Sequence, residues 1–149
     1  MTINVRRVTV DDAEAWKALY SGYRTFYRLP EDAAVVAQTW EWIVNGEHGL
    51  VGLIATDDDV PVGLANTRWF ARPSSAALGL YLDDLFTLPD VRSRGVGRAL
   101  LTSVAQVAGE GGANVVRWIT AADNVTARRL YDDVARETPW VTYDMSPSV

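Results

Sequence analysis

A basic, glycine-containing turn directly before a helical pattern is the segment of this sequence best suited to chemistry. Residues 92–98 read Arg-Ser-Arg-Gly-Val-Gly-Arg, and apolar residues at helical spacing continue from there to residue 108. The first N–H groups of a helix lack intrahelical partners, and the helix dipole is positive at that end. Glycine allows close backbone approach and left-handed conformations. The pattern predicts a phosphate site; the simpler alternative is a tight strand-to-helix turn with solvated arginines.

Two adjacent carboxylates interrupt the apolar run that precedes this turn. Residues 78–87 have the composition of a buried strand, which ends before Pro89, and Asp83 and Asp84 lie within it. Because a buried carboxylate without a partner is costly, these acids need a cation or a ligand. Neighbouring strand residues point to opposite faces, so we expect Asp83 to face a ligand pocket and Asp84 to face away. The alternative is a structural ion pair with Arg68 or Arg117.

The composition excludes several kinds of site. The 149 residues carry a net charge of −5, contain no cysteine and have a single histidine, His48. Disulfides, thiolate ligands and cysteine nucleophiles are therefore absent, and we expect no metal. An acidic chain is poorly suited to nucleic acid, so no nucleic-acid partner is expected. No apolar run reaches the length of a membrane span and no signal-peptide pattern opens the chain, which predicts a cytoplasmic protein with no membrane partner.

The periodicity of apolar residues predicts one α/β domain over residues 1–149 with a mixed sheet. The expected order is β-α-α-β-β-β-α-β-α-β. A first helix carries Trp16, Leu19, Tyr20, Tyr23 and Tyr27 at helical spacing. The other elements are expected at residues 3–8, 33–44, 50–55, 61–70, 78–87, 96–108, 115–120, 124–134 and 138–145.

Two motifs together resemble the GNAT superfamily of N-acetyltransferases. The first is Arg-x-x-Gly-x-Gly at residues 92–97, and the second is Asn-x-x-Ala-x-x-Leu-Tyr at residues 124–131. The order of elements fits as well, so the resemblance covers nearly the whole chain. It implies an α/β fold with a mixed, mostly antiparallel sheet flanked by helices. It also implies an enzyme that transfers an acetyl group from acetyl-CoA to an amine.

The resemblance implies roles for individual residues. The pyrophosphate of acetyl-CoA would bind the basic turn, and the pantetheine arm would run beside residues 85–87, where the amide of Phe86 would polarise the thioester. Tyr131 would be the general acid; the alternative is a purely structural tyrosine. Asn124 would lie near the coenzyme or serve only as a helix cap. The implied coenzyme-binding residues are Leu85, Phe86, Thr87, Arg92, Ser93, Arg94, Gly95, Val96, Gly97, Arg98, Asn124 and Ala127.

Residues 81–86 look like the diamine and polyamine branch of this superfamily. That likeness implies a small, cationic amine acceptor, with Asp83 as a catalytic residue and with Asp83, Asp84 and Tyr27 in the acceptor site. We also expect a homodimer. Two departures from the family pattern stand out: residues 135–140 replace a Gly-Phe pair, and Thr87 stands where valine is frequent.

Other functions stay open or are disfavoured by the sequence. A protein N-terminal or lysine acetyltransferase and a non-catalytic acyl-CoA-binding regulatory module are the open alternatives. No Gly-Lys-Ser/Thr follows the glycines of the basic turn, which argues against a nucleotide triphosphate site. His48 has no nucleophile elbow nearby, which argues against a serine hydrolase.

Overall fold

The computed structural model describes residues 2–148, and these form two compact units that divide between Ile119 and Thr120. No helix in the described part of the chain is long and apolar enough to cross a bilayer. The helices and strands predicted from the sequence are confirmed within about two residues at most of their ends. There are two exceptions: the strand predicted at residues 115–120 is found at Ala113–Arg117, and residues 138–145 form no strand.

The first unit is built on a sheet whose described strands follow one another in chain order. The strands up to β4 pair antiparallel, and β5 is parallel to β4. The β2–β3 hairpin turns through Asp58 and Asp59, which both have positive φ (49° and 68°) and thus match the twist of the strands. The strands are β1 (Ile3–Arg7), β2 (Leu50–Asp57), β3 (Val60–Arg72), β4 (Ala77–Thr87) and β5 (Ala113–Arg117).

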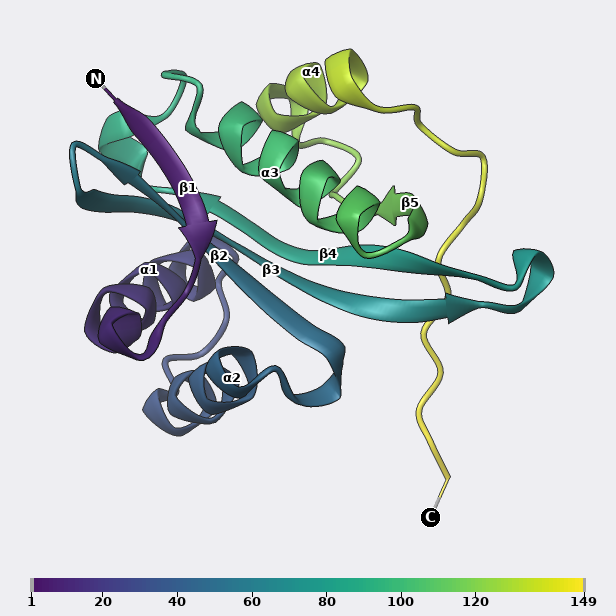
Figure 1. Cartoon of the computed structure of the whole chain (residues 1–149), viewed down its shortest axis with the longest axis horizontal. Helices are drawn as coiled ribbons and strands as arrows, with labels where there is room; N and C mark the ends of the chain where they lie inside the picture. Colours follow the sequence, from purple (N-terminus) through teal and green to yellow (C-terminus); the bar gives the residue numbers. More distant parts are fainter. Residues whose placement is uncertain (1, 149) are drawn as a thin grey trace. The chain divides into compact units, whose positions relative to one another are not determined.

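Helices cover both faces of this sheet. Helices α1 (Ala13–Phe26) and α2 (Ala33–Asn45) lie on one face, and α3 (Val96–Glu110) crosses the other (Figure 1). The Asp32 carboxylate caps α2 by accepting the Val35 N–H at 3.1 Å, and Gly46 ends that helix with φ of 66°. The sheet therefore lies between α1 and α2 on one face and α3 on the other.

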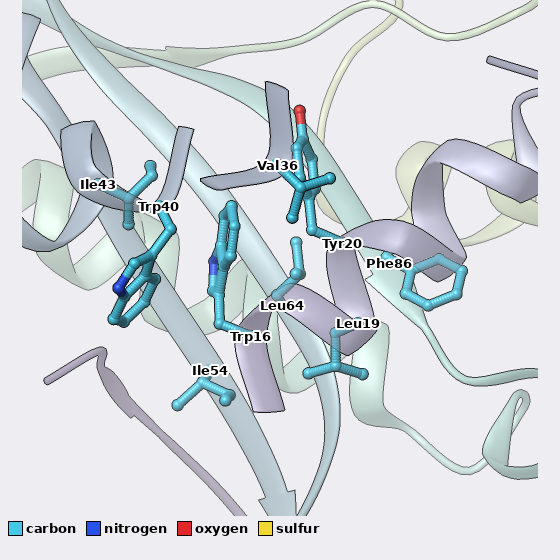
Figure 2. Packing of buried hydrophobic residues seen from close by; sticks show 9 residues of the cluster. All are labelled: Trp16, Leu19, Tyr20, Val36, Trp40, Ile43, Ile54, Leu64 and Phe86. Atoms are coloured by element: carbon cyan, nitrogen blue, oxygen red, sulfur yellow. The ribbon is translucent and has the colours of Figure 1, made fainter. Parts of the chain in front are cut away.

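An aromatic cluster fixes α1 and α2 on the sheet. Trp16 is fully buried, and its ring centroid lies 4.8 Å from that of Tyr20 and 5.4 Å from that of Trp40 (Figure 2). Leu64 and Phe86 contribute to this cluster from β3 and β4. Each fully buried large apolar side chain contributes about 1.5–3 kcal/mol of hydrophobic free energy. This packing holds α1 firmly against the part of β4 that carries the two acids.

The second unit holds α4 (Val125–Val134) and a segment without regular structure, residues 135–148. The strand predicted at residues 138–145 is therefore wrong. Its alternating apolar residues have strand character, but a strand is stabilised by hydrogen bonds to a neighbour. No described strand pairs with it, and Pro139 has no N–H to donate. Trp140 is 82% exposed and Tyr143 is 89% exposed.

Candidate active site

A β-bulge in β4 brings Asp83 and Asp84 to the same face of the sheet. Asn66 pairs with Asp84 and Thr67 pairs with Leu82, so Asp83 is an extra residue in the ladder. The Asp84 carboxylate accepts a hydrogen bond from Asn66, and the Asp83 carboxylate accepts one from Arg68. Asn66 and Arg68 are two residues apart on β3 and share a face. The expectation that the two acids point to opposite faces is wrong, because a bulge re-aims one side chain.

Asp84 sits in a network of hydrogen bonds beneath α1. The Asn66 amide nitrogen donates to Asp84 Oδ2 at 3.0 Å, and Trp16 Nε1 donates to the Asn66 amide oxygen at 3.3 Å. The hydroxyls of Tyr20 and Tyr23 also bond to this carboxylate. Burial raises the pKa of Asp84, while the bonds from Asn66 and the tyrosines oppose that rise. Burial, and then the Asp84 charge, raise the pKa of both tyrosines, which stay protonated donors.

Asp83 is the acid that a ligand can reach. Arg68 Nε donates to both of its carboxylate oxygens, at 3.0 and 3.2 Å, so Arg68 is the ion-pair partner foreseen in the sequence. The guanidinium carbon of Arg68 lies 4.5 Å from the centroid of the Tyr81 ring. Burial raises the pKa of Asp83 and Arg68 lowers it. The Asp83 side chain is 31% exposed, whereas Asp84 is more deeply buried.

The buried position of Asp84 predicts a pH dependence of folding stability. A carboxyl whose pKa is raised in the folded state stabilises the fold below its unfolded pKa of about 3.9 and loses that contribution as pH rises. We therefore expect the free energy of unfolding of the parent, relative to Asp84→Asn, to fall between pH 4 and pH 7. Denaturant unfolding at several pH values measures this difference.

Asp12 provides a control of opposite sign. Its carboxylate accepts two hydrogen bonds from Arg6, at 2.7 and 2.9 Å, and one from the Thr9 N–H at 2.7 Å. The bonds from Arg6 lower the pKa of Asp12 despite its burial. Asp12→Asn should lower the free energy of unfolding by about 2 kcal/mol at pH 7 relative to the parent. This difference should shrink as pH falls, because the parent's Asp12 becomes protonated. If the parent instead became more stable relative to Asp84→Asn as pH rises, this account of the site would be contradicted.

Beyond the bulge, one edge of β4 is open. The parallel pairing of β4 with β5 ends at Tyr81 and Arg117, while β4 continues to Thr87. No strand within residues 2–148 pairs with the stretch from 82 to 87 on that edge. An extended ligand can therefore add to this edge as another strand would.

The direction of the backbone groups corrects one prediction. The Leu88 N–H donates to the Val62 carbonyl at 2.9 Å, which makes these two a hydrogen-bonded pair of β3 and β4. By alternation, the amide of Phe86 also points to β3, and the main-chain groups of Leu85 and Thr87 point to the open edge. Arg92 Nε donates to the Thr87 carbonyl at 3.0 Å, which agrees with that direction. The Phe86 amide is thus not available to a ligand at the open edge; the Leu85 amide is.

The basic turn has the conformation that an anion site requires. Gly95 occupies the N-cap position of α3 with φ of 88°, and Ser93 has φ of 67°. A Cβ placed on Gly95 meets no atom within 4 Å, so the backbone conformation, rather than a neighbouring side chain, demands glycine there. The N–H groups of the first turn of α3 lack intrahelical partners. These features fit a pyrophosphate.

Arg92 has a packing role instead of projecting from the turn. Its guanidinium carbon lies 4.5 Å from the centroid of Phe26 and 5.6 Å from that of Phe86. The side chain therefore ties the turn to α1 and to the end of β4. The groups of the turn that remain able to bind a phosphate are the backbone N–H groups and the exposed side chain of Arg94.

The aromatic row of α1 borders the acids. The ring centroids of Tyr20 and Tyr23 are 5.5 Å apart, and those of Tyr23 and Tyr27 are 4.7 Å apart. The sequence suggested Tyr27 for the acceptor site but missed Tyr20, Tyr23 and Asn66 as partners of Asp84. The spacing of the tyrosines along one helix face was a signal for the row, but nothing in the sequence pointed to Asn66.

The second unit carries the remaining predicted residues on one helix. Asn124 occupies the N-cap position of α4, but its Nδ2 donates to Thr120 Oγ1 at 3.2 Å and its side chain makes no capping bond to the helix. Ala127, Leu130 and Tyr131 form a partly buried stripe, while Val134 is exposed. The structure thus places Asn124, Ala127 and Tyr131 on α4 or at its start, and Tyr27 at the end of α1. The other predicted residues lie on β4, in the basic turn and at the start of α3.

Comparisons with known proteins agree with this architecture. The family model described as the acetyltransferase (GNAT) family matches residues 15–134. A D-amino-acid N-acetyltransferase of Saccharomyces cerevisiae is 30% identical over 148 residues, which cover 95% of this chain and 89% of the relative. An uncharacterized N-acetyltransferase of Bacillus subtilis is 33% identical over 132 residues, covering 87% of each chain. The solved structure of an aminoglycoside N-acetyltransferase in complex with CoA is similar with a TM-score of 0.82 at 22% identity, covering 99% of this chain and 96% of that one.

The chain belongs to the GNAT family of acetyltransferases. It is an acetyl-CoA-dependent N-acetyltransferase, and it has the GNAT fold. The predicted class of fold and of enzyme is confirmed.

Proposed function

We propose that this enzyme acetylates the primary amine of a small, cationic acceptor, and that the bulge of β4 is where the reaction occurs. The observation that carries the proposal is the juxtaposition at one end of β4. An open strand edge and a glycine-capped helix start follow directly after Asp83, a carboxylate accessible to solvent. The first two features suit the pantetheine and pyrophosphate of acetyl-CoA, and the third suits an amine.

The residues of the chain divide the work of the reaction. Acetyl-CoA supplies the thioester. The Leu85 N–H at the open edge donates to its carbonyl oxygen, where negative charge develops; such a donor is worth about 3 kcal/mol in the transition state. Asp83 holds the ammonium and takes up its proton directly or through water. The amine nitrogen forms the amide bond, the carbon–sulfur bond breaks, and the thiolate takes a proton, so one proton is released to solvent for each ammonium acetylated.

We propose that Tyr131 donates the proton that the thiolate takes up. A phenol with a pKa near 10 is protonated at neutral pH and can donate to a thiolate. The motif of residues 124–131 supports this role, and the family model spans residues 15–134 and thus both units. We propose that residues 1–149 work as one catalytic domain.

Charge supports a cationic acceptor. The chain has a net charge of −5, and Asp83 and Asp84 share the face beside the open edge. The relative from Saccharomyces cerevisiae is named a D-amino-acid N-acetyltransferase, which supports an acceptor of small size. The likeness of residues 81–86 to the diamine and polyamine branch favours an acceptor with two amines.

The variant Asp83→Asn tests the proposed acceptor site. It keeps the shape of the side chain, removes its charge and leaves the Arg68 cation uncompensated, so a diamine should bind less well. We expect kcat/KM for 1,5-diaminopentane to fall by at least about 10-fold, since one charge-assisted contact and the group that takes up the proton are both lost. Calorimetry with CoA should show unchanged affinity.

Ionic strength and a matched variant complete this test. Acceptor capture by the parent should weaken with salt, because the Debye length falls from about 10 Å at 0.1 M to about 3 Å at 1 M. Asp90→Asn, at an exposed position outside the strand, serves as the control and should leave kinetics unchanged. Turnover restricted to neutral amines or to protein substrates would refute the cationic acceptor.

We also propose a homodimer in the cytoplasm. The exposed apolar side chains of Trp140, Val141, Tyr143 and Met145 support the dimer, since a second copy of the chain could cover them. The cytoplasmic location stays a prediction from the sequence.

A further inference from the structure

Two arginines and an acid surround Tyr81 at the point where β4 and β5 separate. Tyr81 is paired with Arg117 in the parallel register, and the Arg68 guanidinium lies over its ring. Burial, and then the Asp83 charge, raise the pKa of Tyr81, whereas Arg68 and Arg117 lower it, so the three charged groups lie close enough to act on this phenol. The carboxylate proposed to bind the amine therefore lies near two arginines. A ligand with only amine groups would have no use for these cations.

Of the two arginines near Tyr81, Arg117 is the one that could bind a ligand. It is exposed at the end of β5, and its guanidinium carbon lies 5.8 Å from the centroid of Phe70. Arg68 is paired with Asp83, but no carboxylate within residues 2–148 forms an ion pair with Arg117. A guanidinium supported by an aromatic ring and without an acidic partner is well suited to bind a carboxylate through two parallel hydrogen bonds.

The spacing of Asp83 and Arg117 suits a small ligand with charges at both ends. The two residues are separated by one strand spacing across the sheet and two residues along it, or about 8 Å between Cα atoms. Phe70 and Tyr81, with ring centroids 6.3 Å apart, provide an apolar surface between the charged groups. Gly79 keeps this surface flat, because a Cβ there would lie 2.4 Å from the Phe70 ring.

We propose that the acceptor is an amino acid with a side-chain amine, whose carboxylate binds Arg117 while its reacting amine lies at Asp83. This inference rests on the proposed function and adds a specificity-determining residue to it. The reaction is unchanged: the amine nitrogen gains the acetyl group, the carbon–sulfur bond breaks, and the thiol and one proton are released.

Matched pairs of acceptors test the proposal. Lysine differs from 1,5-diaminopentane by one carboxylate, and ornithine differs from 1,4-diaminobutane in the same way. The parent should prefer each amino acid to its diamine by about 10-fold or more in kcat/KM, since one bidentate charge-assisted contact is gained. Arg117→Gln should abolish that preference by raising KM for the amino acids, with kcat/KM for the diamines unchanged.

The control is Arg7→Gln on β1, at the opposite edge of the sheet, which makes the same change in net charge and should retain the preference. A parent that uses diamines as well as the amino acids would overturn the inference, as would an Arg117→Gln variant that lowers both members of a pair equally. Either outcome leaves the proposed acetylation of small amines intact. Absence of turnover with every amine would instead refute the proposed function and this inference with it.

Discussion

Tyr131→Phe should lower kcat by about 100-fold or more while leaving the affinity for CoA nearly unchanged. The substitution keeps the ring and its place on the partly buried stripe of α4 but removes the proton donor. Loss of a general acid typically costs 10²- to 10⁴-fold in rate. Steady-state kinetics with a saturating amine measures kcat, and calorimetry measures CoA binding.

The same unit offers a matched control for this variant. Tyr143 lies outside any helix or strand and is 89% exposed, so Tyr143→Phe should retain parental turnover. A pre-steady-state burst shows whether product release limits kcat and hides the chemical step. Parental turnover by Tyr131→Phe without such a burst would make Tyr131 a structural residue.

Gly97→Glu should weaken CoA binding by about 100-fold or more. Gly97 is the second residue of α3, so a glutamate there would add a negative charge at the helix start, which would repel the pyrophosphate. Charge-assisted hydrogen bonds contribute about 1.5–3 kcal/mol each, so losing two of them accounts for a factor of 100. Because Gly97 is helical and does not have positive φ, the substitution introduces little backbone strain.

Gly109→Glu makes the same change near the other end of the same helix. Gly109 is exposed, and a Cβ there meets no atom within 4 Å, so this variant should fold and bind CoA like the parent. Circular dichroism and thermal unfolding should show that both variants keep the fold. Parental CoA affinity in a folded Gly97→Glu variant would remove the pyrophosphate from this turn.

The sequence predicted most elements of the fold because their signals are local. The apolar period of α1, carried by Trp16, Leu19, Tyr20 and Tyr23, acts within a single helix. The strand at 138–145 failed for the opposite reason. A strand requires a partner from elsewhere in the chain, and its own alternation of apolar residues does not show whether one exists.

The candidate site shows the same limit more sharply. The types of Asp83, Asp84 and the glycines of the turn were enough to propose a candidate site, because carboxylates in an apolar strand and glycines before a helix are informative by themselves. Their directions depended on the bulge, which arises from the pairing of β4 with β3. One extra residue in the ladder moved Asp83 to the face of Asp84, and the register turned the Phe86 amide away from the open edge. Partners such as Asn66 and Arg68 follow from that register and have no local signal.

Release of free thiol from acetyl-CoA, measured with and without a panel of small amines, tests the central claim most directly. Mass spectrometry of the same mixtures identifies the acetylated product. We predict thiol release that depends on a cationic primary amine and matches the amount of acetylated amine formed. Thiol release that is independent of every amine, or no release at all from an enzyme that binds CoA, would contradict the proposed transfer to a small acceptor.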